Sequence, residues 1–154
     1  MAIALATFVA WIAITVFFLC PKRLTPMEMI FLFFVDTVFE LGMFSVLHVN
    51  LQYIEVTPGV ANSISNLTFR LVELPFLLVT TSNLLLHLSP ILKWGGVISI
   101  VLFTVIVQQI LVWMGVLNMH HWNVWYSGLT VCVAVVASRV MAALIRSVSP
   151  NEAV

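Results

Sequence analysis

The stretch Phe33–Phe44, FFVDTVFELGMF, is almost entirely apolar, yet it carries two carboxylates, Asp36 and Glu40. Residues four positions apart lie on one face of an α-helix, one turn from each other. A helix this apolar suits lipid, where a charge at the helix centre costs roughly 2.5–3.5 kcal/mol. The rest of the chain must therefore show whether the fold is a membrane bundle and what surrounds the two acids.

The composition predicts a membrane protein. Of the 154 residues, 62% are hydrophobic and 8% are charged, and the mean hydropathy is +1.16. A soluble domain carries about 25% charged residues. A water-soluble fold of this size could not bury so much apolar surface, so we expect the chain to be solvated by a lipid bilayer. The net charge is zero and there is no basic run, so nucleic acid is not expected as a partner.

Five segments are apolar enough to cross a bilayer core of about 30 Å, which requires ~20 helical residues. They are residues 2–20, 26–49, 63–88, 96–117 and 122–146. The first lacks a basic leading region, so we expect a retained helix and not a cleaved signal peptide. Thr25-Pro26-Met27-Glu28 is typical of a capping box at a helix start. Pro75 is expected to kink the third segment. The predicted fold is all-α, one five-helix transmembrane bundle over residues 1–154.

The basic residues predict the orientation. Those near the predicted helix ends are Lys22, Arg23, Lys93 and Arg146. All four fall on one side, whereas the segment 50–62 and the turn around His120 contain no Lys or Arg. Lys and Arg are enriched in cytoplasmic loops. The N-terminus is therefore expected outside and the C-terminus in the cytoplasm. The two cysteines, Cys20 and Cys132, fall at different depths, so a disulfide is not expected.

Several polar side chains are predicted to meet inside the bundle. They are Asp36, Glu40, Arg70, Glu73, Gln108, Gln109 and Arg139. Arg70 reaches the depth of Glu40, and its planar guanidinium is expected to bridge Glu40 and Glu73. Three acids face two arginines, so at least one acid is expected to be neutral at pH 7; Asp36 is the candidate. Three interpretations stay open: a polar network that fixes helix packing, a proton or cation path, or a site for partner binding or catalysis.

A second polar and aromatic group is predicted on the outer surface. Its members are His48, Glu55, His120, His121, Trp122, Asn123 and Trp125. Imidazoles and carboxylates can bind metals, but no metal-type spacing occurs, so hydrogen-bonding histidines are favoured and no metal or cofactor is expected. Trp122 and Trp125 fit either an interfacial anchor or a recognition patch. No phosphate loop, nucleophile elbow or His-Glu-x-x-His motif occurs, so no catalytic residue is assigned and an enzyme is not expected.

The segment His121–Ser127, HWNVWYS, follows a short polar turn and opens a long apolar helix. It resembles a group of small five-helix membrane proteins of Bacillus-like, spore-forming bacteria that have no assigned activity. The resemblance covers roughly a third of the chain, mainly the last two helices. It implies a bacterial cytoplasmic membrane and transfers no activity.

The leading expectation for function is a non-enzymatic structural or accessory component of the membrane. The alternative is a small proton-coupled transporter or channel, oligomeric, with Asp36, Glu40 and Arg70 along its path. A membrane enzyme acting on lipid ranks third. The expected partners are the bilayer itself and either another membrane protein or a second copy of the chain.

Overall fold

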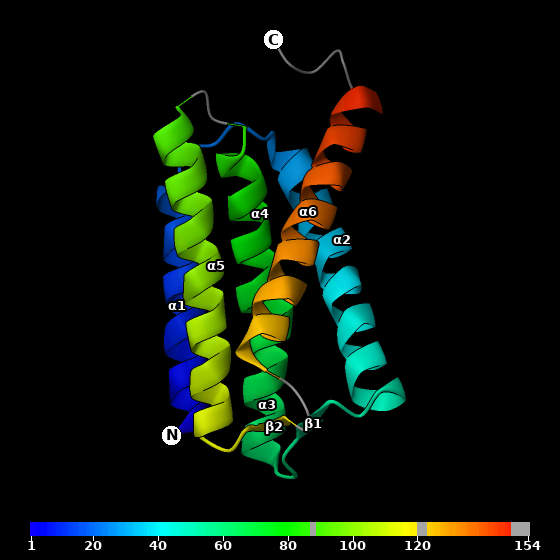
Figure 1. Ribbon diagram of the computed structural model, residues 1–154. Helices are drawn as coiled ribbons and strands as arrows, with labels where there is room; N and C mark the ends of the chain where they lie inside the picture. The colour runs from blue at the N-terminus through cyan, green and yellow to red at the C-terminus, as the bar shows by residue number, and fades with distance from the viewer. Residues whose placement is uncertain (87–88, 120–122, 149–154) are drawn as a thin grey trace.

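The computed structural model describes residues 1–86, 89–119 and 123–148. Five helical runs lie side by side and alternate in direction (Figure 1). The first two are α1 (Ala2–Leu19) and α2 (Pro26–Ser45), which continues as a π-helical turn, η1 (Val46–Asn50). The third consists of α3 (Val60–Thr68), the π turn η2 (Phe69–Glu73) and α4 (Leu74–Leu84). The last two are α5 (Pro90–Trp113) and α6 (Val124–Val148).

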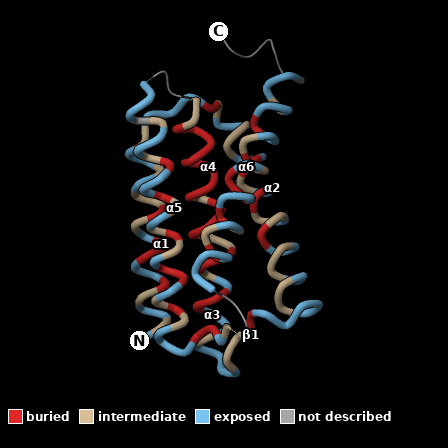
Figure 2. Tube along the Cα trace, in the orientation of Figure 1, coloured by how far each residue is buried: buried red, intermediate tan, exposed pale blue. Residues whose placement is uncertain are grey.

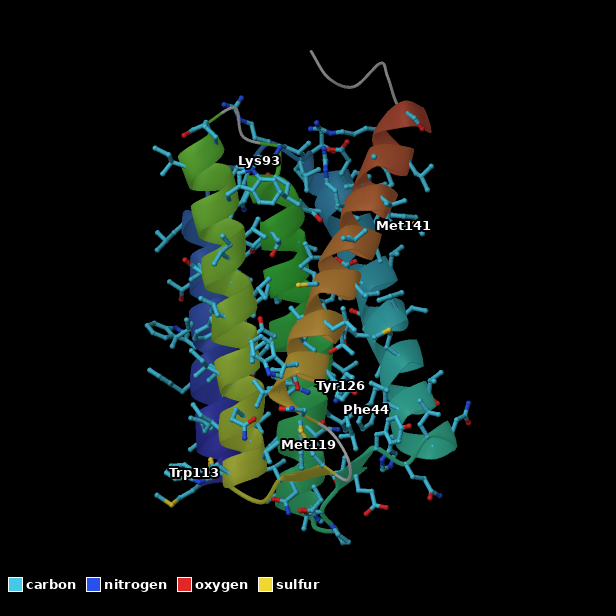
Figure 3. The ribbon with its side chains drawn as sticks, in the orientation of Figure 1. Phe44, Lys93, Trp113, Met119, Tyr126 and Met141 are labelled. Carbon is cyan, nitrogen blue, oxygen red and sulfur yellow. The ribbon has the colours of Figure 1, made fainter. Side chains whose placement is uncertain are left out.

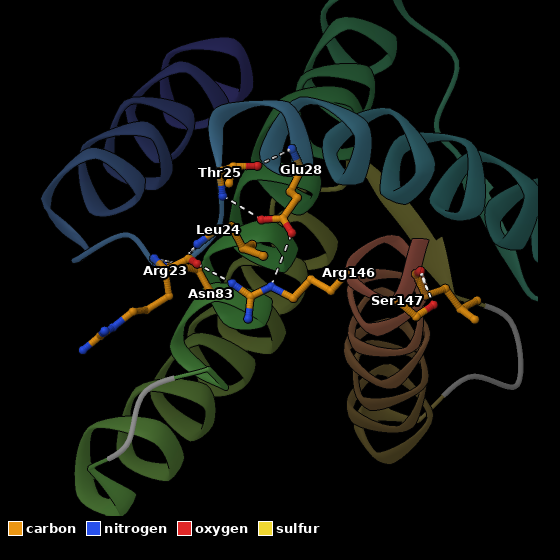
Figure 4. Close-up of polar contacts among 8 residues, drawn as sticks. Arg23, Leu24, Thr25, Glu28, Asn83, Arg146 and Ser147 are labelled. Carbon is orange, nitrogen blue, oxygen red and sulfur yellow. Dashed lines mark hydrogen bonds and ion pairs between the residues drawn. The ribbon is translucent and has the colours of Figure 1, made fainter. Parts of the chain in front are cut away.

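The predicted start of α2 is confirmed. The Thr25 amide donates to Glu28 Oε2 at 2.7 Å, and the Glu28 amide donates to Thr25 Oγ1 at 3.3 Å (Figure 4). These two bonds satisfy amides that a helix start otherwise leaves unpaired, and Pro26, at the first helical position, has no amide to satisfy. This local motif was readable because all its partners lie within four consecutive residues.

Both predicted ends of the fourth helix are wrong. The fourth helix starts at Pro90 and not at Gly96, because Pro90 fits the first turn of a helix and Ser89 precedes it in an extended conformation. The same helix ends at Trp113 and not at Leu117. Gly115 turns the chain away with a φ of +70°, a conformation that glycine adopts without steric cost.

A small sheet closes one end of the bundle and was not predicted. Strand β1 (Ile54–Val56) pairs antiparallel with β2 (Leu117–Met119). Ile54 and Leu117 are buried in a cluster with Phe69 and Val116. The sheet therefore ties the segment after η1 to the segment after α5, which are distant in sequence.

The run α3–η2–α4 is the centre of the fold. Helix α4 contacts α1, α2, α5 and α6, and all of its residues except Phe76 are buried (Figure 2). The four surrounding helices instead expose large apolar side chains such as Phe8, Phe34, Leu102 and Val136. Apolar surface of this extent is not stable in water but is normal where lipid is the solvent.

In the part of the chain that the structure describes, four helical segments are long and apolar enough to cross a membrane, judged by length and composition. They are Ala2–Leu19, Pro26–Asn50, Lys93–Trp113 and Val124–Ser147. The central run lies among them and is divided by η2. The N-terminus lies at the end that carries the sheet, and α6 ends at the opposite end of the bundle (Figure 1).

Candidate functional site

The centre of the bundle holds an ion pair between η2 and α2. Arg70 Nη1 lies 3.7 Å from Glu40 Oε2, and the two side chains are 6% and 9% exposed. Arg70 Nε donates to Asn66 Oδ1 at 3.1 Å, and the guanidinium carbon lies 3.7 Å from the centre of the Phe44 ring. Glu40, Asn66 and Phe44 thus surround one cation with a charge, an amide oxygen and a π face.

The sequence around Pro75 explains why the helix widens at Arg70. Proline has no amide hydrogen, so one carbonyl in the preceding turn receives no helical hydrogen bond. The chain forms the π turn Phe69–Glu73 there, and the Leu74 amide donates to the Phe69 carbonyl five residues back. The helix continues to Leu84, so the proline does not interrupt it. Single π turns occur frequently at functional sites.

A second polar contact lies one turn from the ion pair along α2. Ser138 on α6 donates to Asp36 Oδ2 at 2.8 Å, and its oxygen lies 2.8 Å from that of Ser82 on α4. All three residues are buried. A hydroxyl has one hydrogen to donate, so when Ser138 donates to Asp36, Ser82 must donate to Ser138. Asp36 therefore joins α2, α4 and α6, and its direct polar partner is Ser138 and not Arg70.

The predicted bridge from Arg70 to Glu73 is wrong. Glu73 is 1% exposed, and neither of its carboxylate oxygens has a hydrogen-bond partner among the described residues. Arg139 on α6 is half-buried, and its Nη1 is likewise buried without a hydrogen bond. Buried polar groups are nearly always paired, so these two call for an explanation beyond packing. Residues three apart on a π turn do not face each other as they do on an α-helix, which separates Arg70 from Glu73.

The two glutamines of α5 separate as neighbours on a helix must. Gln108 is buried and lines a cavity with Glu40, Arg70 and Thr104, whereas Gln109 is exposed. The prediction that Gln109 joins the interior network is therefore wrong, because consecutive residues point about 100° apart around a helix. The cavity has a volume of about 30 Å³. That is room for one or two water molecules beside the ion pair.

Asn83 was not assigned to the network, but it fixes the end of the bundle opposite the sheet. Its Oδ1 accepts from the amides of Arg23 at 2.6 Å and Leu24 at 3.2 Å (Figure 4). Its Nδ2 donates to the Pro21 carbonyl at 2.7 Å. Thr80 and Thr81, in the same helix, donate only to their own helix backbone. The polar run Thr80–Asn83 was visible in the sequence, but its partners lie about 60 residues away.

We call the set Asn66, Arg70, Glu40, Asp36, Ser138, Ser82 and Asn83 the polar column. Four of its members lie on the central run between residues 66 and 83. At about 1.5 Å per residue, this stretch is roughly 25 Å long, close to the thickness of a bilayer core. The column thus extends along most of the bundle.

The outer group is only partly assembled among the described residues. His48 Nδ1 lies 2.7 Å from the Ile54 carbonyl oxygen. The imidazole stacks on the Phe44 ring, with 5.1 Å between the ring centres and 4° between the ring planes. A carbonyl can only accept, so Nδ1 carries the hydrogen. Phe44 also covers Arg70, so His48 is linked through one ring to the polar column.

The other predicted members of the outer group are exposed or lie outside the described residues. Glu55, Asn123 and Trp125 are exposed, while His120, His121 and Trp122 lie outside the described residues. Within residues 1–86, 89–119 and 123–148, no three His, Cys, Asp or Glu side chains are close enough to hold a metal ion together.

Fold and composition together define a helical membrane protein with a buried polar column. In comparisons with known proteins, no family model, no curated protein and no solved structure matches the chain. The resemblance of His121–Ser127 to small bacterial five-helix proteins therefore stays a prediction.

Proposed function

We propose that the chain crosses a bacterial cytoplasmic membrane five times, with the N-terminus outside. The fifth span is the central run α3–η2–α4, which extends between the two ends of the bundle among the four apolar helices. The four basic residues Lys22, Arg23, Lys93 and Arg146 belong to the end opposite the sheet, which supports a cytoplasmic location for that end. The bacterial assignment rests on the resemblance alone.

Cysteine accessibility tests the fifth span directly. Asn50 and Ser89 are exposed and flank the central run at its two ends. In a background with Cys20→Ser and Cys132→Ala, Asn50→Cys should react with a membrane-impermeant maleimide in intact cells. Ser89→Cys should react only after the membrane is permeabilised. Equal labelling of both sites in intact cells would mean that the central run does not cross.

The function best supported by the geometry is a non-enzymatic structural or accessory role in the membrane. The carrying observation is that the polar column makes its contacts within the bundle, linking α2, α4, α6 and the loop before α2. The cavity beside Arg70, at about 30 Å³, has room for water but not for a metabolite. Polar contacts of this kind fix how helices pack in lipid.

A stability measurement in detergent tests that role. Asp36→Asn and Glu40→Gln should weaken the fold while leaving proton permeability of liposomes unchanged. The matched control is Gln109→Leu, which alters an exposed polar side chain at a similar depth. If Asp36→Asn and Glu40→Gln behave like Gln109→Leu in unfolding experiments, the column does not hold the bundle together.

One observation favours a second candidate, proton transport. Glu73 is buried, and no group of the described residues bonds to either of its carboxylate oxygens. A network that leaves a member unpaired is less stable than an apolar core. Among the described residues, three buried acids, Asp36, Glu40 and Glu73, outnumber the one fully buried cation, Arg70. Proton binding and release by these acids would explain why an unpaired carboxyl is buried in the bundle.

Liposomes containing the purified protein separate the two candidates. Internal pH is followed after an imposed gradient for the wild type, Glu73→Gln and Glu40→Gln, with Gln109→Leu as control. A leak in the wild type that disappears in folded Glu73→Gln would establish proton movement through that carboxyl. Tight vesicles for every variant would leave the structural role as the better account.

A further inference from the structure

A wholly apolar groove lies between α1, α2 and α4 and is separate from the polar column. Its volume is about 330 Å³, and its lining includes four phenylalanines and Ile30. The four rings are Phe17 on α1, Phe33 and Phe34 on α2, and Phe76 on α4. Phe34 and Ile30 are 63% and 56% exposed, so the groove opens to the surroundings of the bundle.

The rings hold the groove in shape. Phe76 packs edge-to-face against Phe17 and Phe33, with ring centres 5.2 Å and 5.0 Å apart. Phe33 packs in the same way against Phe34, with ring centres 5.9 Å apart. Such arrangements are the preferred geometry for aromatic pairs. Phe76 is also the one residue of α4 that is not buried. A preformed groove reduces the ordering that an occupant would otherwise require.

Apolar surface alone gives no selectivity inside a bilayer, because lipid tails are as apolar as the side chains they would touch. A specific occupant must be recognised by its polar end. The groove ends near the loop between α1 and α2, where Phe17 supplies one wall. Lys22 Nζ lies 4.5 Å from the centre of the Phe17 ring and 4.8 Å from that of Phe18. A positive charge is therefore fixed at this end of the groove.

Among the described residues, no acidic side chain neutralises the cations at this end. Glu28, the acid nearest in sequence, is already used: it caps Thr25 and pairs with Arg146 at 3.3 Å. Within residues 1–86, 89–119 and 123–148, no carboxylate lies within ion-pair distance of Lys22 or Arg23. Both side chains are exposed. The groove thus joins an apolar trough to the exposed cation of Lys22, which Arg23 follows in the sequence, and this combination suits a lipid with a negative headgroup.

We propose that this groove binds one acyl chain of an anionic phospholipid from the cytoplasmic leaflet, with the phosphate held by Lys22 and Arg23. The inference rests on the membrane orientation proposed above. Anionic lipids are abundant on that side of the membrane and attract basic residues close to its surface. Fixing one lipid here fills the space between α1 and α2, which contact each other little.

The test measures lipid selectivity in vesicles of dioleoylphosphatidylcholine containing the full-length protein. Spin-labelled phosphatidylglycerol and spin-labelled phosphatidylcholine are compared by the fraction of each whose motion the protein restricts. The wild type should prefer phosphatidylglycerol, and Lys22→Gln should lower that preference about fivefold, the effect of one lysine at a membrane surface. Lys93→Gln is the matched control, since Lys93 lies at the same end of the bundle but outside the groove (Figure 3).

A second pair of variants tests the groove without altering charge. Ile30→Trp fills it, whereas Ile98→Trp places the same bulk on α5, away from it; the two isoleucines are 56% and 55% exposed. Only Ile30→Trp should abolish the preference. Equal restriction of both lipids by the wild type, or equal effects of Lys22→Gln and Lys93→Gln, would overturn the proposal. If the protein fails to enter vesicles and restricts neither lipid, the membrane placement itself is wrong.

Discussion

Arg70, on the π turn of the central run, lies 3.7 Å from Glu40 on α2, in a position where neither side chain is more than a tenth exposed. A second ion pair, Arg146 with Glu28, is shorter at 3.3 Å, but its arginine is 40% exposed. Distance alone would rank the second pair as stronger. Burial makes the loss of one partner more costly for the Arg70–Glu40 pair, because water cannot solvate the charge that is left in the interior.

The two arginines therefore differ in their value to the fold. Arg70→Gln leaves Glu40 buried without its partner and should lower the free energy of unfolding by about 3 kcal/mol. Arg146→Gln, the same chemical change at an exposed pair, should cost no more than about 1 kcal/mol. Unfolding in mixed detergent micelles measures both. Equal losses for the two variants would contradict the role assigned to burial.

The serine chain at Asp36 predicts a ranking. Ser138→Ala removes the direct donor to Asp36 and should destabilise most, by about 1–2 kcal/mol. Ser82→Ala should cost less, because Ser138 still donates to the carboxylate. Ser99→Ala is the control, since that exposed hydroxyl donates to the carbonyl of Gly95 in its own helix. The same unfolding experiment gives the order, and a larger loss for Ser82→Ala than for Ser138→Ala would reverse the proposed direction of the chain.

The thiol of Cys20 reports on the loop that Asn83 holds. Burial raises the pKa of Cys20, and the Asn83 hydrogen bond and the charge of Lys22 lower it less than burial raises it. A raised pKa reduces the thiolate fraction at neutral pH, so the wild type should react slowly with maleimide and faster as the pH rises. Asn83→Ala removes the hydrogen bond that lowers the Cys20 pKa, but it also releases three backbone contacts and should expose the thiol. Because burial is the largest cause of the raised pKa, exposure should dominate and shift the rate profile to lower pH.

The control for that experiment changes a polar side chain of the same helix that does not contact the loop. Thr80→Ala lies in the same helix, but its hydroxyl donates only to the Phe76 carbonyl of that helix. Its labelling profile should match the wild type when measured with Cys132→Ala in both proteins. An unchanged profile in Asn83→Ala would mean that the loop does not depend on Asn83.

Local features were predictable from the sequence and long-range ones were not. The capping box at Thr25 and Glu28 involves neighbours only, and the pairing of Glu40 with Arg70 followed from depth along two helices. Asp36 could not be matched with Ser138, because serine is ordinary in a helix and its partner lies 102 residues away. The β1–β2 pairing escaped for a similar reason. Leu117 ends an apolar run and Ile54 lies in a mixed polar segment, so only tertiary contact makes them strands.

Glu73 gives the sharpest contrast with Glu40. A buried carboxyl without a hydrogen bond adds nothing to the fold that an apolar side chain of similar size would not supply better. Glu73→Leu should therefore leave the free energy of unfolding unchanged or raise it by about 1–3 kcal/mol. Glu40→Leu should lower it by about 3 kcal/mol, since it leaves the Arg70 cation buried without its ion-pair partner. Destabilisation by Glu73→Leu as large as that by Glu40→Leu would show that Glu73 has a structural partner, and the case for a proton-binding role would lose its main support.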